Sequence, residues 1–179
     1  HCVTNITKFQ FASHTRASPR SFYRFEQKGV NFIILDACFR EDEVAYSRKN
    51  FHWKDTKKKK IEARWLEAQL GRVSGPVVVF VHQRLDEKQN YQIKNAPEIR
   101  KILEDSKKVL AVFQGHSHKN DYQQIAGIHY VTMAAVVEGK ETNSYGELQV
   151  FADGSLKVQG FASQSSYDFG SIATPKQSS

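Results

Sequence analysis

The chain has 179 residues, with 26 Lys and Arg against 19 Asp and Glu, and its formal net charge is +7. Hydrophobic residues make up 40% and charged residues 25%, which excludes a largely disordered chain. No apolar run approaches the ~18 residues that a membrane-spanning helix needs, so we expect no membrane protein. The length fits one domain with a sizeable core. Lys57 to Lys60 supply four of the positive charges, and the rest of the chain is only mildly basic. We therefore do not expect a nucleic acid as partner, and a basic nucleic-acid-binding module is kept as the alternative hypothesis.

The first residues are unusual. The chain begins at His1 without Met, and neither a basic segment nor an apolar segment typical of a signal peptide follows. We therefore expect a processed chain or a fragment of a longer one, and no targeting segment decides between a cytoplasmic and an exported protein. Cys2 and Cys38 are too few for a disulfide scaffold, and whether they pair is left open.

The first third of the chain predicts a hairpin and a loop. Residues 1–20 are polar and show no clear period. Apolar and polar residues then alternate, Lys28-Gly29 is typical of a turn, and a β-branched run follows, so residues 22–36 predict an antiparallel hairpin. Residues 40–60 are charged and aromatic and predict a surface loop.

The middle of the chain predicts alternating helices and buried strands. A helical apolar stripe indicates a helix over residues 61–70. Continuous apolar runs at residues 77–81 and 109–113 are typical of strands buried on both faces. Between them, Asn95 is a suitable N-cap for a helix that ends near Lys108. Strand, helix and strand with short links predict a βαβ unit with parallel strands.

The end of the chain predicts strands only. Residues 128–133 read as a strand, and Asp153-Gly154 between two alternating runs is typical of a two-residue hairpin turn. Residues 162–179 are rich in Ser and resemble a fraying tail. The fold class is therefore α/β with a mixed sheet, in one domain over residues 1–165 with a flexible tail over 166–179.

Three histidines follow the two buried strands. His82 comes directly after the first strand, and His116 and His118 follow the second. Ligands of open α/β sheets bind at the carboxyl ends of the strands, and neutral imidazole is the commonest metal ligand. The pattern predicts a metal site at this edge of the sheet. We expect Gly115 to make the sharp turn that brings His116 and His118 to the site.

The spacing leaves the kind of metal open. Three imidazoles could hold a catalytic zinc ion. Nearby carboxylates could instead add hard oxygen ligands for Mn, Fe or Mg. The candidate carboxylates are those of Asp36, Asp86 and Asp121.

Two of these segments resemble a known family. Phe80-Val81-His82-Gln83 and Gly115-His116-Ser117-His118 resemble the last two signature blocks of the calcineurin-like metallophosphoesterases. The strand that ends at Asp36 is similar to the strand that precedes them in that family. His1-Cys2 resembles the end of the family's Gly-Asn-His block, and Cys after this His is similar to the ADP-ribose/CDP-alcohol diphosphatase branch.

The resemblance implies a four-layer α/β sandwich that binds two metal ions, Mn, Fe or Zn. His82 and His116 would bind one metal and His118 the other, while His1 would meet the phosphate and help the leaving group. The implied activity is hydrolysis of phosphoester or pyrophosphate bonds by a hydroxide that two metals activate. The implied substrate is a phosphorylated small molecule or a nucleotide.

The chain departs from the family pattern in its first part. It contains no Asp-x-His, no Gly-Asp and no Gly-Asn sequence, so the blocks that carry most ligands of the first metal are missing. We therefore expect the C-terminal portion of the domain, with an incomplete metal site unless the missing N-terminal part completes it. A homologue that has lost its activity or acts as a regulator is the alternative.

Other candidate residues have two interpretations each. Arg84 could bind a phosphate oxygen through its guanidinium fork, or lie at the surface. Asn95 could contact the substrate, or serve only as the N-cap. His129 lies within a predicted strand and could belong to the core or stand beside the metal site.

Overall fold

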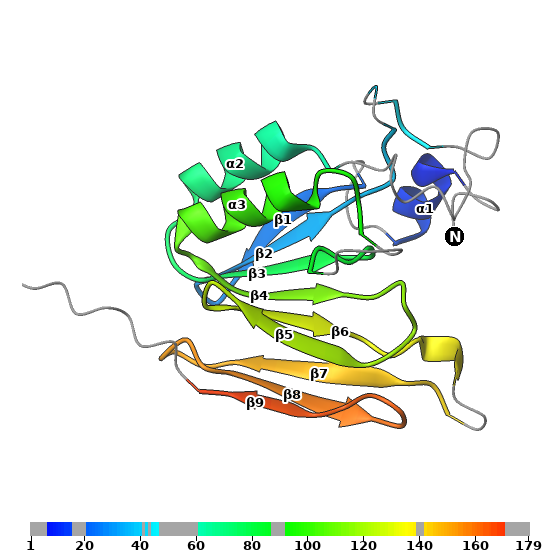
Figure 1. Ribbon diagram of the computed structural model, residues 1–179, viewed down its shortest axis with the longest axis vertical. Coiled ribbons are helices and arrows are strands. Elements are labelled where there is room, and N and C mark those ends of the chain that lie inside the picture. Colours follow the sequence, from blue (N-terminus) through cyan, green and yellow to red (C-terminus); the bar gives the residue numbers. More distant parts are fainter. Residues whose placement is uncertain are drawn as a thin grey trace, which may run out of the picture.

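The computed structural model describes residues 7–15, 21–40, 42, 44–46, 61–86, 92–138 and 142–170. Helices and strands alternate through the middle of the chain, and strands alone form its end (Figure 1). The elements are α1 (Lys8–Thr15), β1 (Tyr23–Gln27), β2 (Val30–Leu35), α2 (Ala63–Arg72), β3 (Val77–Val81), α3 (Ala96–Ser106), β4 (Val109–Gln114), β5 (Asp121–Ile125), β6 (Ile128–Thr132), the 3₁₀ turn η3 (Val136–Glu138), β7 (Tyr145–Val150), β8 (Leu156–Phe161) and β9 (Tyr167–Phe169).

The strands form two sheets. The larger sheet has six strands in the order β1-β2-β3-β4-β6-β5, and the smaller has three in the order β7-β8-β9. In the larger sheet β2, β3, β4 and β6 are parallel, and β1 and β5 pair antiparallel at its edges. Helices α2 and α3 cover one face of this sheet, and the smaller sheet lies against the other face (Figure 1). The described residues thus form a mixed-sheet α/β sandwich as expected, but with three layers and not the four that the resemblance implies.

Each face of the central strands has its own core. In β3, Val77, Val79 and Val81 pack with the apolar residues of α2 and α3, whereas Val78 packs between the two sheets. Successive side chains of a strand point to opposite faces, so a continuous apolar run suits a strand that is covered on both sides. This is why the five apolar residues of β3 could be identified as a buried strand from sequence.

Most predicted elements are confirmed. β1 and β2 form the antiparallel hairpin expected over residues 22–36, with the turn at Lys28-Gly29. β3 and β4 are parallel neighbours, with α3 between them in the chain, so the predicted βαβ unit is also confirmed. Pairing of β4 with β6 extends the parallel part of the sheet by one strand.

The hairpin at Asp153-Gly154 has a longer turn than predicted. Val150 pairs with Leu156, and the Gly154 amide donates to the Phe151 carbonyl at 3.0 Å. Gly154 has a φ of 83° and is the last residue of this four-residue turn, an arrangement typical of three-residue hairpin loops that end in a left-handed glycine. The glycine is needed, as expected, but as the last residue of a three-residue loop.

The tail expected from residue 162 was partly wrong. β9 pairs with β8 from Val158 to Leu156, and Phe169 is buried between the sheets. Three residues are too few for a sequence period to reveal a strand, and long-range contacts with β8 and with the aromatic residues of β5 and β6 stabilise it. Helix α1 and strand β5 were also missed, because the first has no apolar stripe and the second is mostly polar.

Some predictions lie outside the described residues. They concern His1, Cys2, the run from Lys57 to Lys60 and most of the loop over residues 40–60. The helices in the described part of the chain are all too short or too polar to cross a membrane.

Candidate metal centre

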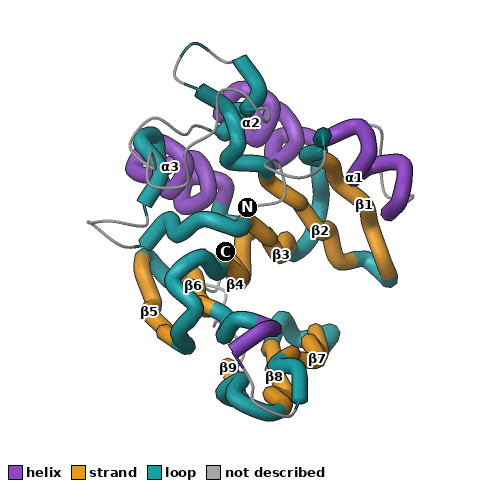
Figure 2. The backbone as a smooth tube through the Cα atoms, turned by 90° about the vertical axis from the view of Figure 1, so that its right-hand side faces the viewer, coloured by secondary structure: helices purple, strands orange, loops and turns teal. Residues whose placement is uncertain are grey.

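A cavity of about 860 Å³ lies at the carboxyl ends of β2, β3 and β4. Figure 2 looks onto this edge of the larger sheet, where the loops that follow the parallel strands come together. Asp36 after β2, His82 after β3, and His116 and His118 after β4 all line the cavity. The parallel topology therefore brings the three predicted metal ligands to one cavity, together with one of the three candidate carboxylates.

His82 and His116 are in direct contact. The Nδ1 atom of His116 lies 3.2 Å from the Nε2 atom of His82, and the two rings meet edge to face at 74°. Two imidazoles at metal–nitrogen distances of roughly 2.0–2.1 Å would subtend an angle of about 100° at one metal ion when their nitrogens are this far apart. That angle lies between the octahedral and tetrahedral values. The pair thus has the spacing of two ligands of one metal.

The loop after β4 has an unusual backbone. His116 has a φ of 72° and His118 a φ of 61°, a conformation that is rare for residues other than glycine. The Ser117 amide donates to the Gly115 carbonyl at 2.9 Å and closes a γ-turn around His116. Such conformations cost about 1–3 kcal/mol each and persist only where the surrounding structure holds them.

Gly115 does not have the role that the sequence suggested. The left-handed conformation is at His116 and His118, and Gly115 itself has no positive φ. Its amide donates to the His82 carbonyl at 3.0 Å, and a Cβ there would meet that oxygen at 3.6 Å, an ordinary contact. The turn is made by the histidines themselves, and the hydrogen bond from the Gly115 amide to His82 anchors its first residue.

Lys8 of α1 also reaches the cavity. Its ammonium group pairs with the Asp36 carboxylate, donates to the Cys38 carbonyl at 2.9 Å and lies 3.7 Å from the centre of the Phe39 ring. The other Asp36 oxygen accepts from the Cys38 amide at 2.7 Å. Lys8 was missed from sequence because nothing in the irregular first 20 residues distinguishes it from other surface lysines.

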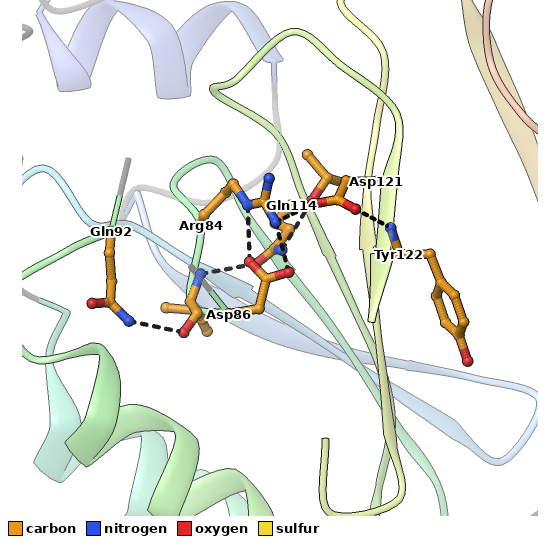
Figure 3. A network of polar contacts seen from close by, with 8 residues as sticks. Arg84, Asp86, Gln92, Gln114, Asp121 and Tyr122 are labelled. Atoms are coloured by element: carbon orange, nitrogen blue, oxygen red, sulfur yellow. Dashed lines mark hydrogen bonds and ion pairs between the residues drawn. The ribbon is translucent and has the colours of Figure 1, made fainter. Parts of the chain in front are cut away.

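Arg84 lies outside the cavity lining and is almost completely buried. Its Nε and Nη2 atoms donate to the two carboxylate oxygens of Asp86, both at 2.9 Å, and Nη2 also pairs with Asp121 (Figure 3). Burial by itself would lower the pKa of the guanidinium, but the two carboxylates outweigh it and raise the pKa above its usual value. The guanidinium group of Arg84 thus binds two carboxylates of the protein. Asp86 and Asp121 in turn bind this arginine.

Asn95 is buried at the start of α3 and does not line the cavity. Its side chain accepts from the Ile61 amide at 3.1 Å and donates to the Ile61 carbonyl at 3.0 Å and to Glu98 at 3.1 Å. It stands at the N-cap position without a side-chain cap bond. The structure therefore confirms Asn95 as the N-cap residue of α3, but its side chain connects this helix to the chain before α2 and does not reach the cavity.

His129 belongs to an aromatic cluster away from the cavity. Its Nδ1 atom lies 2.9 Å from the Tyr122 hydroxyl, and its ring stacks on Phe169. Burial lowers the pKa of this imidazole, so it is neutral near pH 7. Of the two interpretations of His129, the structure supports the core residue.

The described residues do not contain a complete ligand set. Among them, no group of three His, Cys, Asp or Glu side chains has the geometry to hold a metal ion. His82 and His116 fit one metal as a pair, whereas two metals need further ligands.

Neither a family sequence model nor a curated protein sequence matches this chain. Solved structures do match it. A dimetal phosphatase from Danio rerio superposes with a TM-score of 0.70 and 14% identity, covering 84% of this chain and 60% of the phosphatase. GAP50, described as the anchor in the inner membrane complex of Plasmodium, superposes with a TM-score of 0.55 and 12% identity, covering 86% of this chain and 54% of that protein.

The chain thus spans less than two thirds of the length of either structure. At these identities the likeness concerns the fold and not the activity. It agrees with the resemblance of the histidine segments that follow β3 and β4. The described part of the chain has the fold of the calcineurin-like metallophosphoesterases.

Proposed function

We propose that this protein is a metal-dependent hydrolase of phosphoester or pyrophosphate bonds, and that its histidine cavity is the active site. The observation that carries the proposal is the 3.2 Å separation between the His82 and His116 nitrogens. This distance places two imidazole nitrogens at the spacing of two ligands of one metal ion. His118 lines the same cavity and is our candidate ligand for a second ion.

We assign a separate chemical role to each candidate residue of the site. His82 and His116 would hold one ion. The left-handed backbone at His116 keeps its imidazole turned toward His82. Bound divalent ions, of Mn, Fe or Zn, would neutralise the phosphoryl oxygens and lower the pKa of the attacking water. His1 is our candidate for the imidazole that gives a proton to the leaving group. It lies outside the described residues.

We further propose that the remaining ligands come from another segment of polypeptide, the N-terminal part of the same domain. Three facts support this: the described residues lack a three-ligand group, the sequence lacks the Asp-x-His and Gly-Asp blocks, and the chain spans 60% of the fish phosphatase. The substrate class would be phosphorylated small molecules or nucleotides. The apolar residues of the cavity wall, such as Phe80, Phe113 and Leu148, favour a substrate with an apolar leaving group.

The test is hydrolysis of an aryl phosphodiester with added Mn²⁺ by the complete protein, which includes the N-terminal part of the domain, together with its metal content by elemental analysis. We expect His116→Ala to lower both the Mn²⁺ affinity and the rate by roughly 100-fold or more. His129→Phe is the matched control, since it removes a histidine of the aromatic cluster outside the cavity, and should leave both unchanged. Full activity in His116→Ala would refute the site.

A homologue without catalytic activity is the second candidate. It is favoured by the likeness to GAP50, a protein described as an anchor, and by the incomplete ligand set of the described residues. This candidate predicts a folded protein that neither binds Mn²⁺ above background nor hydrolyses the aryl phosphodiester, even when the N-terminal part of the domain is supplied. The same measurements therefore separate the two candidates.

A further inference from the structure

An ion pair connects the two loops that carry the candidate ligands. Arg84 follows His82 by two residues, and Asp121 follows His118 by three. The Nη2 atom of Arg84 pairs with Asp121 and so joins the loop after β3 to the loop after β4 (Figure 3). The paired contact with Asp86, at 2.9 Å on each side, fixes the plane of the guanidinium within its own loop.

Two hydrogen bonds reinforce this connection. The side chain of Gln114, next to Gly115, accepts from the Leu85 amide at 2.9 Å and donates to the Thr132 hydroxyl at 3.0 Å. The Gly115 amide donates to the His82 carbonyl at 3.0 Å. The loops are thus joined at three points, and the imidazole pair lies between them.

We propose that Arg84 is a positioning residue, which sets the distance between the His82 loop and the His116 loop through Asp121. The proposal rests on the proposed function, in which both loops supply metal ligands. It replaces the idea that Arg84 binds a phosphate. The side chain is 7% exposed, it does not line the cavity, and its Nε and Nη2 atoms are engaged by two carboxylates.

The physical reason lies in the cost of the loop conformation. His116 and His118 occupy a backbone region that persists only when surrounding contacts hold it. An ion pair with a nearly buried arginine is less screened by solvent than a surface pair. Lysine could not replace the arginine, because a single ammonium group lacks the planar fork that contacts both carboxylate oxygens of Asp86 and one oxygen of Asp121 at the same time.

Asp121→Asn tests the connection with little risk to the fold. Asp121 is 43% exposed, and the Arg84–Asp86 pair is kept. We expect hydrogen exchange of the Gly115 and Leu85 amides to become roughly tenfold faster, the change typical of losing a charge-assisted hydrogen bond. Exchange of the core amides of Val79 and Val112 should not change. This measurement needs neither metal nor substrate.

A second readout is the affinity for Mn²⁺ alone, by calorimetry. We expect it to fall between about 10-fold and 100-fold in Asp121→Asn and in Arg84→Lys, and to recover at least partly in Asp121→Glu, which keeps the carboxylate. Asp105→Asn, which removes a fully exposed ion pair with Lys101, is the matched control and should change nothing.

Two results would overturn the proposal. The first is unchanged hydrogen exchange of the Gly115 and Leu85 amides in Asp121→Asn and in Arg84→Lys. The second is equal acceleration of exchange at every core amide, which would indicate general destabilisation. If the complete protein, with the N-terminal part of the domain, binds no Mn²⁺, the proposed function is overturned instead. The exchange rates would still decide whether Arg84 sets the spacing of the two loops.

Discussion

The ring of Phe169 stacks on the imidazole of His129, with ring centres 4.2 Å apart and planes inclined by 18°. Phe169 lies in β9 of the smaller sheet and His129 in β6 of the larger one, so the contact joins the two sheets. Tyr122 completes the cluster: its ring stacks on Phe169 at 5.1 Å, and its hydroxyl contacts His129.

Phe169→Ala should therefore destabilise the protein although it lies near the end of the chain. The ring is 7% exposed, and we expect a loss of about 3 kcal/mol in the free energy of unfolding, typical of removing a buried aromatic ring. Phe151→Ala is the matched control. Phe151 is 47% exposed, so removal of its ring should change the free energy of unfolding by less than about 0.5 kcal/mol. Urea unfolding measures both, and equal effects would contradict the role of β9.

The same cluster predicts a pH dependence of stability. Burial lowers the pKa of His129 below its ordinary value of 6.5, so the unfolded chain takes up a proton more readily than the folded one. Stability should decrease as the pH falls from about 6.5 toward the folded-state pKa, and this contribution should level off below it. Burial raises the pKa of Tyr122, so its hydroxyl stays neutral throughout.

The measurement is the free energy of unfolding at several pH values, in the wild type and in His129→Phe. The variant should lose less stability than the wild type as the pH falls, since all other histidines are common to both proteins. Identical pH profiles would show that His129 does not titrate in this way.

The backbone conformation at His118 predicts an unusual order of stability for two variants at this position. Its φ of 61° is strained for alanine but not for glycine, and its side chain is exposed. We expect His118→Gly to be more stable than His118→Ala by about 1 kcal/mol in thermal or urea unfolding. At Lys101, an exposed position inside α3, the order should be reversed, since glycine is a poor helix former. The same order at both positions would argue against a left-handed His118.

Asn95→Ala should affect stability and not the candidate site. It removes two hydrogen bonds to the Ile61 backbone and one to Glu98, and leaves buried backbone groups without their partner. We expect a loss of about 2 kcal/mol of stability, with the Mn²⁺ affinity and the KM for an aryl phosphodiester unchanged. Gln123→Ala, at an exposed position of β5, is the control. A raised KM at wild-type stability would restore the substrate-binding interpretation of Asn95.

Sequence patterns were sufficient for the parallel strands β3 and β4 and for the grouping of the three histidines. The apolar runs of β3 and β4 are long enough to indicate strands buried on both faces, and strands joined by a helix are parallel. Parallel strands end at the same edge, so the residues after them had to meet there. For this reason His82, His116 and His118 could be grouped at one cavity, although 34 positions separate His82 from His116.

Tertiary structure alone decided which partner each polar side chain has. Arg84 could have met a phosphate, solvent or a carboxylate, and its pairing with Asp121 depends on two loops that are distant in sequence. The strand β9 and the use of Asn95 as a connection to Ile61 depend on long-range contacts in the same way. Periodicity reports which face of an element is apolar, because that property repeats along the chain. Hydrogen bonds and ion pairs do not repeat, and only the packed fold selects them.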